Sequence, residues 1–453
     1  MMQPQHKPHV TRRGMIAGGT AAIASGGVLT GKGRAVETAA PITIVINQSP
    51  WFDSFRRTVA EYEKRSGNKV NLDVNPFAGS LEKQRQSVRS VHGQYDLLVM
   101  NSGWFAEMYF GEFVEPLTDI DPSFKLERDV YTLDDTVYFD AAKKVMAASG
   151  KLMSMPIAPL IPLLYYREDL YKSTGLKVPQ TFAELEANAI KLNHPPHIYG
   201  IVQRGARGTA SVSYDFYPYL YGFGGNVFKD PGAGDYQVTL NSTAGRTALE
   251  YYLRLAKEAG HPRTASIDQA EVILNMVTGK AAHIMVVAAA WSQMDNPDKS
   301  AVVGKVDFAP PPHARGFPTA PGLGHWLGGV SRNVPDARKR ATVEFLNWFQ
   351  TRDAQMFYAR AGGIPISSAI YNSPLAAEPR FRWMKAMAEA LPHAVNIYYF
   401  PQASEVTGIL DVGLNRAVAG EITAVAALNS MADQIYHVMA SNGYRTGKLP
   451  SVL

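Results

Sequence analysis

The sequence predicts an α/β protein, and two observations support this prediction. Between residues 42 and 100, short apolar runs alternate with amphipathic helical patterns in the order β-α-β-α-β, which indicates an open sheet with helices packed on it. The chain has 453 residues, and about 410 of them follow an N-terminal leader, which suggests two lobes rather than one.

The elements of this first segment follow from their apolar spacing. The run Ile42–Ile46 is nearly all apolar, as expected of a strand covered on both faces. Apolar residues recur at helical spacing from Phe52 to Tyr62, and Gly67 is placed to end that helix. The elements expected next are a strand over 70–74, a polar amphipathic helix over 80–91 and a strand over 95–100.

Three later helices are marked by their ends. Thr181 and Glu184 have the spacing of a capping box, which predicts a helix to about Leu192. Ser242 or Thr243 begins a second helix that Gly260 closes, and a third is expected over 336–351.

Polar residues and a tryptophan follow the first and third predicted strands. The two loops read Asn47–Trp51 and Asn101–Trp104. Ligands of open α/β sheets bind beyond the carboxyl ends of the strands. These loops are therefore the first places to look for a site.

The N-terminus has the layout of a cleaved export signal. Arg12 and Arg13 precede a weakly apolar run from Met15 to Leu29, and small residues follow. The run is too short and too rich in glycine for a membrane anchor. We expect residues 1–40 to be a twin-arginine signal peptide, and the alternative is a disordered basic tail.

Charge and cysteine content narrow the function. Residues 1–40 hold five of the 45 basic and one of the 40 acidic residues, so the remainder is nearly neutral and suggests no nucleic-acid partner. The chain has no cysteine, which excludes disulfides, thiolate metal sites and the acylated cysteine of a lipoprotein. His194 and His197 lack a neighbouring carboxylate cluster, so we expect no metal site. We also expect no cofactor.

Five segments in order resemble the family 1 extracellular solute-binding proteins of ABC importers, the group that includes maltose-binding protein. The segments are Tyr95–Asp119, Met155–Leu170, Gly175–Leu185, Gly279–Trp291 and Gly362–Pro365. The resemblance covers residues 42 to about 440. Each motif alone is weak, but their common order favours the fold.

The resemblance implies a type II periplasmic-binding-protein fold, with two hinge-linked lobes and a ligand cleft between them. By analogy, lobe I spans 41–154 and is completed by 324–362, while lobe II spans 155–323 and is completed by 363–453. The implied function is a periplasmic protein, not lipid-anchored and not an enzyme, that captures a sugar, oligosaccharide or sugar alcohol. The resemblance implies the ABC permease as a partner, the leader implies the twin-arginine export machinery, and we expect a monomer.

Eight residues are candidates for binding such a ligand, since sugar C–H faces need aromatic rings and sugar hydroxyls need amides, carboxylates or guanidinium groups. They are Trp291, Trp51, Trp104, Trp326, Tyr214, Asp215, Arg204 and Asn101. The resemblance places Trp291 at a ligand-stacking position and Tyr214 with Asp215 at another aromatic contact. Loop position selects Trp51, Trp104 and Asn101.

Each candidate has a plainer alternative. Trp291 could be a core residue, Trp51 and Trp104 could pack between loop and helix, and Trp326 could pack in a hinge. Arg204 could be a surface arginine. Two other functions also stay open at this point, a binding protein for a non-sugar solute (a phosphorylated polyol, an amine or a peptide) and an enzyme exported by the twin-arginine route.

Overall fold

The computed structural model describes residues 40–208 and 211–452. The expected signal peptide, residues 1–40, lies almost wholly outside the described part of the chain, so it stays a prediction. All elements below belong to one unit of the chain, Ala39–Leu453.

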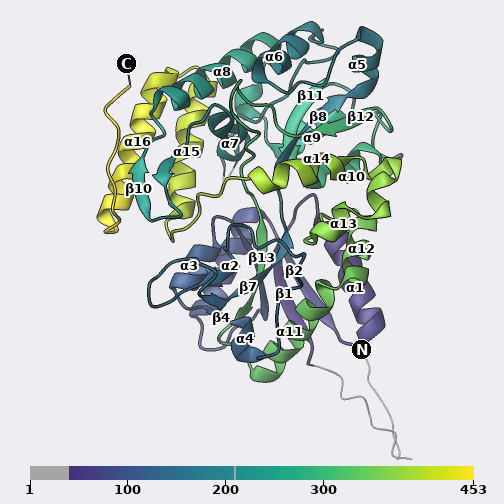
Figure 1. Ribbon diagram of the computed structural model, residues 1–453, viewed down its shortest axis with the longest axis vertical. Helices are drawn as coiled ribbons and strands as arrows, with labels where there is room; N and C mark the ends of the chain where they lie inside the picture. Colours follow the sequence, from purple (N-terminus) through teal and green to yellow (C-terminus); the bar gives the residue numbers. More distant parts are fainter. Residues whose placement is uncertain (1–39, 209–210, 453) are drawn as a thin grey trace, which may run out of the picture. The chain divides into compact units, whose positions relative to one another are not determined.

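The first lobe is built on a six-stranded sheet, drawn in the lower half of Figure 1. Its path runs β2-β1-β3-β13-β4, and β7 also pairs with β13. The first three strands are parallel, whereas β13 runs antiparallel to β3, β4 and β7. Its strands are β1 (Ile42–Asn47), β2 (Val70–Asn75), β3 (Leu97–Asn101), β4 (Val114–Glu115), β7 (Ser154–Ala158) and β13 (Trp326–Ser331).

The helices around this sheet come from two distant parts of the chain. Helices α1 and α12 are in contact, and α11 packs on α4, β1 and β13. The helices of the first lobe are α1 (Phe52–Ser66), α2 (Phe77–Arg89), α3 (Phe105–Phe110), α4 (Leu117–Ile120), α11 (Asp336–Phe349) and α12 (Arg352–Arg360). The two-stranded ladder of β5 (Tyr138–Phe139) and β6 (Lys151–Leu152) lies beside α4.

The predicted β-α-β-α-β order is confirmed, with two shifts. Helix α2 spans Phe77–Arg89, whereas it was expected over 80–91. The third strand begins at Leu97, not at Tyr95, because the buried Asp96 side chain takes over a ladder bond. Its carboxylate accepts the Thr43 backbone N–H at 2.7 Å and also a bond from Arg338 at 2.8 Å.

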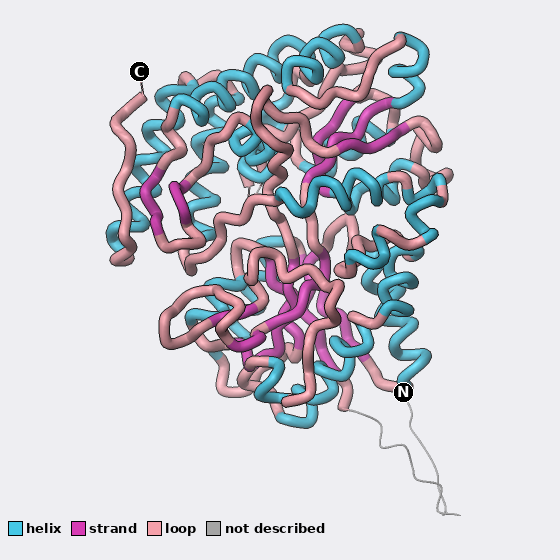
Figure 2. Tube along the Cα trace, in the orientation of Figure 1, coloured by secondary structure: helices cyan, strands magenta, loops and turns pink. Residues whose placement is uncertain are grey.

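The second lobe contains a smaller antiparallel sheet, magenta in the upper half of Figure 2, in the order β11-β8-β12. Its strands are β8 (Pro162–Arg167), β11 (His283–Val287) and β12 (Val306–Ala309), and a separate hairpin joins β9 (Phe228–Asp230) to β10 (Asp235–Val238). The helices are α5 (Glu168–Thr174), α6 (Phe182–Lys191), α7 (Val212–Gly222), α8 (Thr243–Ala259), α9 (Gln269–Val277), α10 (Trp291–Met294), α13 (Ser368–Tyr371), α14 (Trp383–Ala390), α15 (Ala403–Val418) and α16 (Ala424–Ser441).

The predicted helix ends are also confirmed. Thr181 and Glu184 form both bonds of the capping box. The Ser242 hydroxyl accepts the Gly245 N–H at the start of α8, and Gly260 follows its end. Gly67 ends α1 with φ of 77°, a left-handed conformation that glycine adopts without steric cost.

The chain passes between the two sheets more than once. It first leaves the sheet of the first lobe after β7. Because β7 pairs with β13, that sheet includes residues up to Ala158, whereas the lobe boundary was expected after residue 154. It returns between β12 and β13. Several separate segments therefore connect the two lobes.

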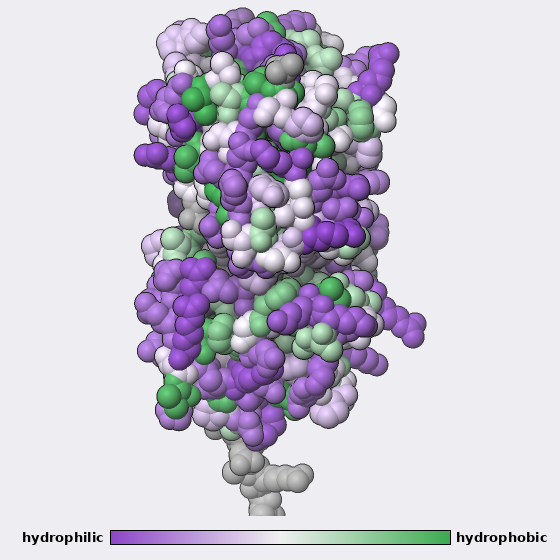
Figure 3. All heavy atoms as spheres, turned by 90° about the vertical axis from the view of Figure 1, so that its left-hand side faces the viewer, coloured by the Kyte–Doolittle hydropathy of each residue, from purple (hydrophilic) through white to green (hydrophobic). Residues whose placement is uncertain are grey.

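Apolar side chains are concentrated inside the molecule. The face shown in Figure 3 is mostly hydrophilic, with small scattered hydrophobic patches. No helix among the described residues is both long enough and apolar enough to span a membrane.

The Asp96 bonds generate a stability prediction. In the Asp96→Ala variant the Thr43 N–H and the Arg338 guanidinium lose their acceptor, so the free energy of unfolding should fall by about 3 kcal/mol. Urea unfolding measures this loss. The control is Asp119→Ala, which removes an exposed pair with Lys151 and should cost less than about 1 kcal/mol. Equal losses in the two variants would show that Asp96 does not stabilise the junction of β1 and β3.

Candidate functional site

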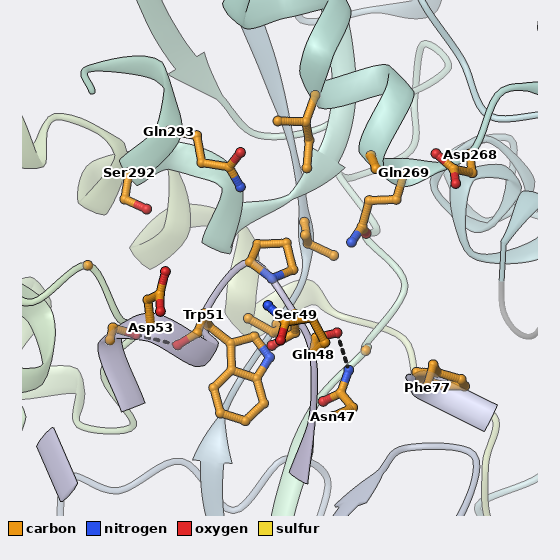
Figure 4. A pocket seen from close by; sticks show the side chains of 18 of the residues that line it. Asn47, Gln48, Ser49, Trp51, Asp53, Phe77, Asp268, Gln269, Ser292 and Gln293 are labelled. Carbon is orange, nitrogen blue, oxygen red and sulfur yellow. Dashed lines mark hydrogen bonds between the residues drawn. The ribbon is translucent and has the colours of Figure 1, made fainter. Parts of the chain in front are cut away.

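A cavity of about 1630 Å³ is lined by residues of both lobes. The first lobe contributes the loops after β1, β2 and β3, and the second contributes α7, α9 and the segment that begins at α10. In Figure 4, Gln293 and Gln269 lie across open space from Ser49 and Trp51. The site thus lies at the carboxyl ends of parallel strands, where ligands of such sheets bind.

Three aromatic residues line the cavity on the first lobe; Phe77 is partly exposed, whereas Trp51 and Trp326 are 0% and 4% exposed. Trp51 is the residue before α1, and Phe77 opens α2. Trp326 begins β13, with its ring centroid 5.7 Å from that of Trp51 and 5.9 Å from that of Phe77. The antiparallel strand β13 therefore brings a third ring to two that come from βα loops.

The wall on the second lobe carries a buried ion pair. Arg204 lies 3.5 Å from the Asp215 carboxylate, donates to Gln269 at 2.6 Å and stacks over the Tyr214 ring. Burial raises the pKa of Asp215 to about 6, although Arg204 and a hydrogen bond from the Tyr252 hydroxyl act in the opposite direction. These contacts hold the guanidinium at the cavity surface.

Five polar side-chain atoms of lining residues are buried without a hydrogen-bond partner in the described chain. They are Asn47 Oδ1, Ser49 Oγ and Trp51 Nε1 on the first lobe and the Tyr214 hydroxyl and Arg204 Nε on the second; the last of these lies 3.5 Å from the Asp215 carboxylate. The other polar atom of the Asn47 side chain, Nδ2, donates a hydrogen bond to the Gln48 carbonyl (Figure 4). A buried polar group without a partner costs about 1–3 kcal/mol, so these atoms favour a ligand that supplies hydroxyl groups.

Five of the eight candidate residues line the cavity: Trp51, Trp326, Tyr214, Arg204 and Asn101. Asn101 also has a local role, because its Oδ1 accepts the Gly103 N–H at 3.1 Å. Arg204 is only 3% exposed, so it is not a surface arginine.

The other three candidates lie behind the cavity. The Trp104 ring supports Phe77 at 4.6 Å and Trp326 at 5.3 Å. Asp215 contacts Arg204 from the interior. The Trp291 ring stacks on Trp383 at 5.2 Å, while the next residues along the chain, 292 and 293, line the cavity.

Other lining residues were not among the candidates. Phe77 follows the second strand, so the loop rule that selected Trp51 would have found it. Asn47 and Ser49 lie in a loop that the same rule singled out. Gln269, Gln293 and Tyr398 have no local sequence signal, because distant parts of the chain fold toward the cavity.

Comparisons with known proteins agree with this architecture. The chain is 25% identical over 261 residues to a mannitol-binding protein of Pseudomonas aeruginosa, and the match covers 56% of each protein. The chain thus spans only about half the length of this curated relative. Two solved structures share the fold over nearly their whole length.

The first is an ABC transporter solute-binding protein from Agrobacterium radiobacter K84 in complex with ribitol, with a TM-score of 0.76, 23% identity and coverage of 88% of this chain and 99% of the other. The second is a maltose-bound protein of T. maritima, with a TM-score of 0.79, 22% identity and coverage of 88% and 100%. Both support the two-lobed fold. The family model for the bacterial extracellular solute-binding protein matches residues 47–356, and the chain therefore belongs to that family.

Proposed function

We propose that this protein is the extracytoplasmic binding component of an ABC transporter, and that it captures a sugar, oligosaccharide or sugar alcohol in the cavity between its lobes. The observation that carries the proposal is the combination of aromatic side chains with five buried polar atoms that lack a hydrogen-bond partner in the described chain, all in residues that line the cavity. Rings bind the C–H faces of a sugar, and the polar atoms bind its hydroxyls. The ligands named for the relatives, mannitol, ribitol and maltose, support the same class.

In this proposal the lobes close on the ligand by a hinge motion. The ligand shifts the balance toward the closed form because it contacts both lobes only there. Lobe I comprises about 41–158 and 324–362, and lobe II comprises the rest of the chain from 159 onward. The closed form is the one delivered to the permease.

The proposal also covers the export route of the protein and its oligomeric state. A twin-arginine signal peptide directs the folded chain to the periplasm, where it acts as a monomer without a lipid anchor. It has no catalytic role. Phe77, Trp51 and Trp326 contact the ligand's carbon faces, while Tyr214, Arg204 and Asn101 face its hydroxyls. Trp104, Trp291 and Asp215 support these side chains from behind.

A ligand panel tests the class of solute. Monosaccharides, oligosaccharides and polyols should include at least one compound that raises the melting temperature and changes tryptophan fluorescence. A ligand at 100 times its dissociation constant adds about 2.7 kcal/mol to stability. If the whole panel leaves both signals unchanged while an amino acid or peptide shifts them, the carbohydrate proposal is wrong.

The Phe77→Ala variant tests the aromatic wall. It should weaken binding of the best neutral sugar or polyol about tenfold, because losing a stacked ring costs on the order of 1.4 kcal/mol. Phe317→Ala is the matched control, since Phe317 is 45% exposed and does not line the cavity. Isothermal titration calorimetry measures both, and equal affinities would contradict a stacking role for Phe77.

The Tyr214→Phe variant tests the unpartnered hydroxyl. It keeps the ring but removes one bond to the ligand, so affinity should fall about fivefold, or roughly 1 kcal/mol. Tyr221→Phe is the control, because Tyr221 lies on the same helix, also has a buried hydroxyl without a partner in the described chain, and does not line the cavity. A loss in the control as large as in Tyr214→Phe would assign the effect to the helix.

A further inference from the structure

The cavity has an unbalanced set of charges. Its lining includes four acidic residues, Asp53, Asp268, Glu271 and Asp295. It also includes five basic residues, Arg57, Arg204, Arg207, Lys299 and Arg380. The two groups are almost equal in number, but they differ in how many members already have a partner.

Each acidic residue of the lining is already engaged. Asp53 pairs with Arg56 at 3.3 Å, Glu271 with Arg263 at 3.7 Å and Asp295 with Arg382 at 2.6 Å. None of these three arginines lines the cavity. The fourth, Asp268, caps α9 by accepting the Glu271 backbone N–H at 2.9 Å. Three of the four negative charges of the lining are thus paired with arginines outside it, and Asp268 is held by a backbone N–H.

Four of the five basic residues have no carboxylate partner within residues 40–208 and 211–452. Arg204 pairs with Asp215, but Arg57, Arg207, Lys299 and Arg380 form no ion pair there. Outside the leader the chain is nearly neutral, so this positive excess is local. A cleft lined by unpaired charge of one sign attracts ligands of the opposite sign.

Two of the four unpaired cations belong to one end of the cavity. A Cβ added at Gly362 would lie 3.3 Å from the Ser292 Cβ and 4.0 Å from the Ser54 Cβ, so α1 and α10 approach each other at this glycine. Arg57 follows Ser54 by three residues on α1, which places both on one helix face. Arg380 lies over the Trp291 ring at 5.7 Å, next to Ser292.

The backbone at this end of the cavity has an uncommon conformation at Gly362. Gly362 has φ of 108°, a conformation that residues with a Cβ rarely adopt. Ser54, Ser292 and Gly362 all line the cavity. Lys299 lines it too, from the segment that follows α10. Small residues therefore leave room between side chains that carry unpaired positive charge.

We propose that the ligand is a sugar or polyol that carries one anionic group, a carboxylate or a phosphate, and that this group binds between Arg57 and Arg380 at the α1–α10 end of the cavity. This inference rests on the proposed function and deepens it, because it adds an anionic group to the ligand and so includes the phosphorylated polyols that the sequence left open. The hydroxyl-bearing part of the ligand lies against the aromatic rings and the unpartnered polar atoms. Arginine suits this role because its planar fork of N–H donors matches carboxylate and phosphate oxygens.

Matched pairs of compounds test the proposal by calorimetry on the mature chain. Mannitol is compared with mannitol 1-phosphate, and glucose with glucuronate. The anionic member of at least one pair should bind ten times more tightly or better, and the pair that does so distinguishes phosphate from carboxylate. Raising the salt concentration should reduce this preference, because exposed charges are screened, and should leave neutral binding unchanged. Neutral members that bind as tightly as both anionic ones would overturn the inference and leave the proposed function standing.

Single variants locate the anionic group. Arg57→Gln and Arg380→Gln should each weaken binding of the preferred anionic compound about three- to tenfold, with no change for its neutral partner. Lys64→Gln is the matched control. Lys64 is exposed on the same helix as Arg57 and does not line the cavity, and its substitution also removes one positive charge.

A loss in Arg207→Gln alone would put the anion at the opposite end of the cavity and overturn its placement. Equal losses for charged and neutral compounds in Arg57→Gln and Arg380→Gln would overturn the role of charge. If no compound of either pair binds and the wider carbohydrate panel also fails, it is the proposed function that is wrong.

Discussion

Strand β13 ties the late part of the chain into the sheet of the first lobe. It runs antiparallel in a sheet whose first three strands are parallel, and it bonds to β3, β4 and β7. These pairings join residue 326 to a sheet that begins at residue 42. Because the chain must return from the second lobe to form them, the two lobes are held together on either side of one cavity.

The start of β13 links this topology to the site. Gly324 and Trp326 line the cavity, while His325 between them is fully buried. Burial lowers the pKa of His325 to about 3, so the imidazole is neutral at ordinary pH, with Nε2 3.1 Å from the Thr136 hydroxyl. A Cβ at position 324 would lie 2.5 Å from the Tyr214 hydroxyl, so only glycine lets α7 approach this strand. The same three residues therefore lie both at the start of a central strand and beside the cavity.

Local patterns were sufficient for the first lobe's elements but not for their arrangement. The apolar run at Ile42 and the spacing from Phe52 to Tyr62 depend on neighbours in sequence, and both elements form as predicted. The position of β13 depends on pairings over more than 200 residues, which no local pattern encodes. The start of β3 was also not predictable from neighbours in sequence. The strand begins at Leu97 rather than Tyr95, where the Asp96 side chain accepts the Thr43 N–H.

The site was predictable where the loops after parallel strands supply it. Trp51 and Asn101 follow β1 and β3 and line the cavity, as that rule implies. The rule has no counterpart for Gln269, Gln293 or Tyr398, which reach the cavity from helices and loops of the second lobe. For Trp291, the sequence could not show that its ring would stack on Trp383, 92 positions later. Side-chain direction at such positions is set by tertiary packing.

A crystal structure of the chain with the tightest-binding compound of the carbohydrate panel shows directly where the ligand binds. We expect electron density for the compound between the first lobe, at Phe77 and Trp326, and the second lobe. We also expect a ligand hydroxyl within about 3.2 Å of the Tyr214 hydroxyl. Density for the compound outside this cavity, or inside it with Ser49 and Tyr214 still without partners, would show that the proposed site is wrong.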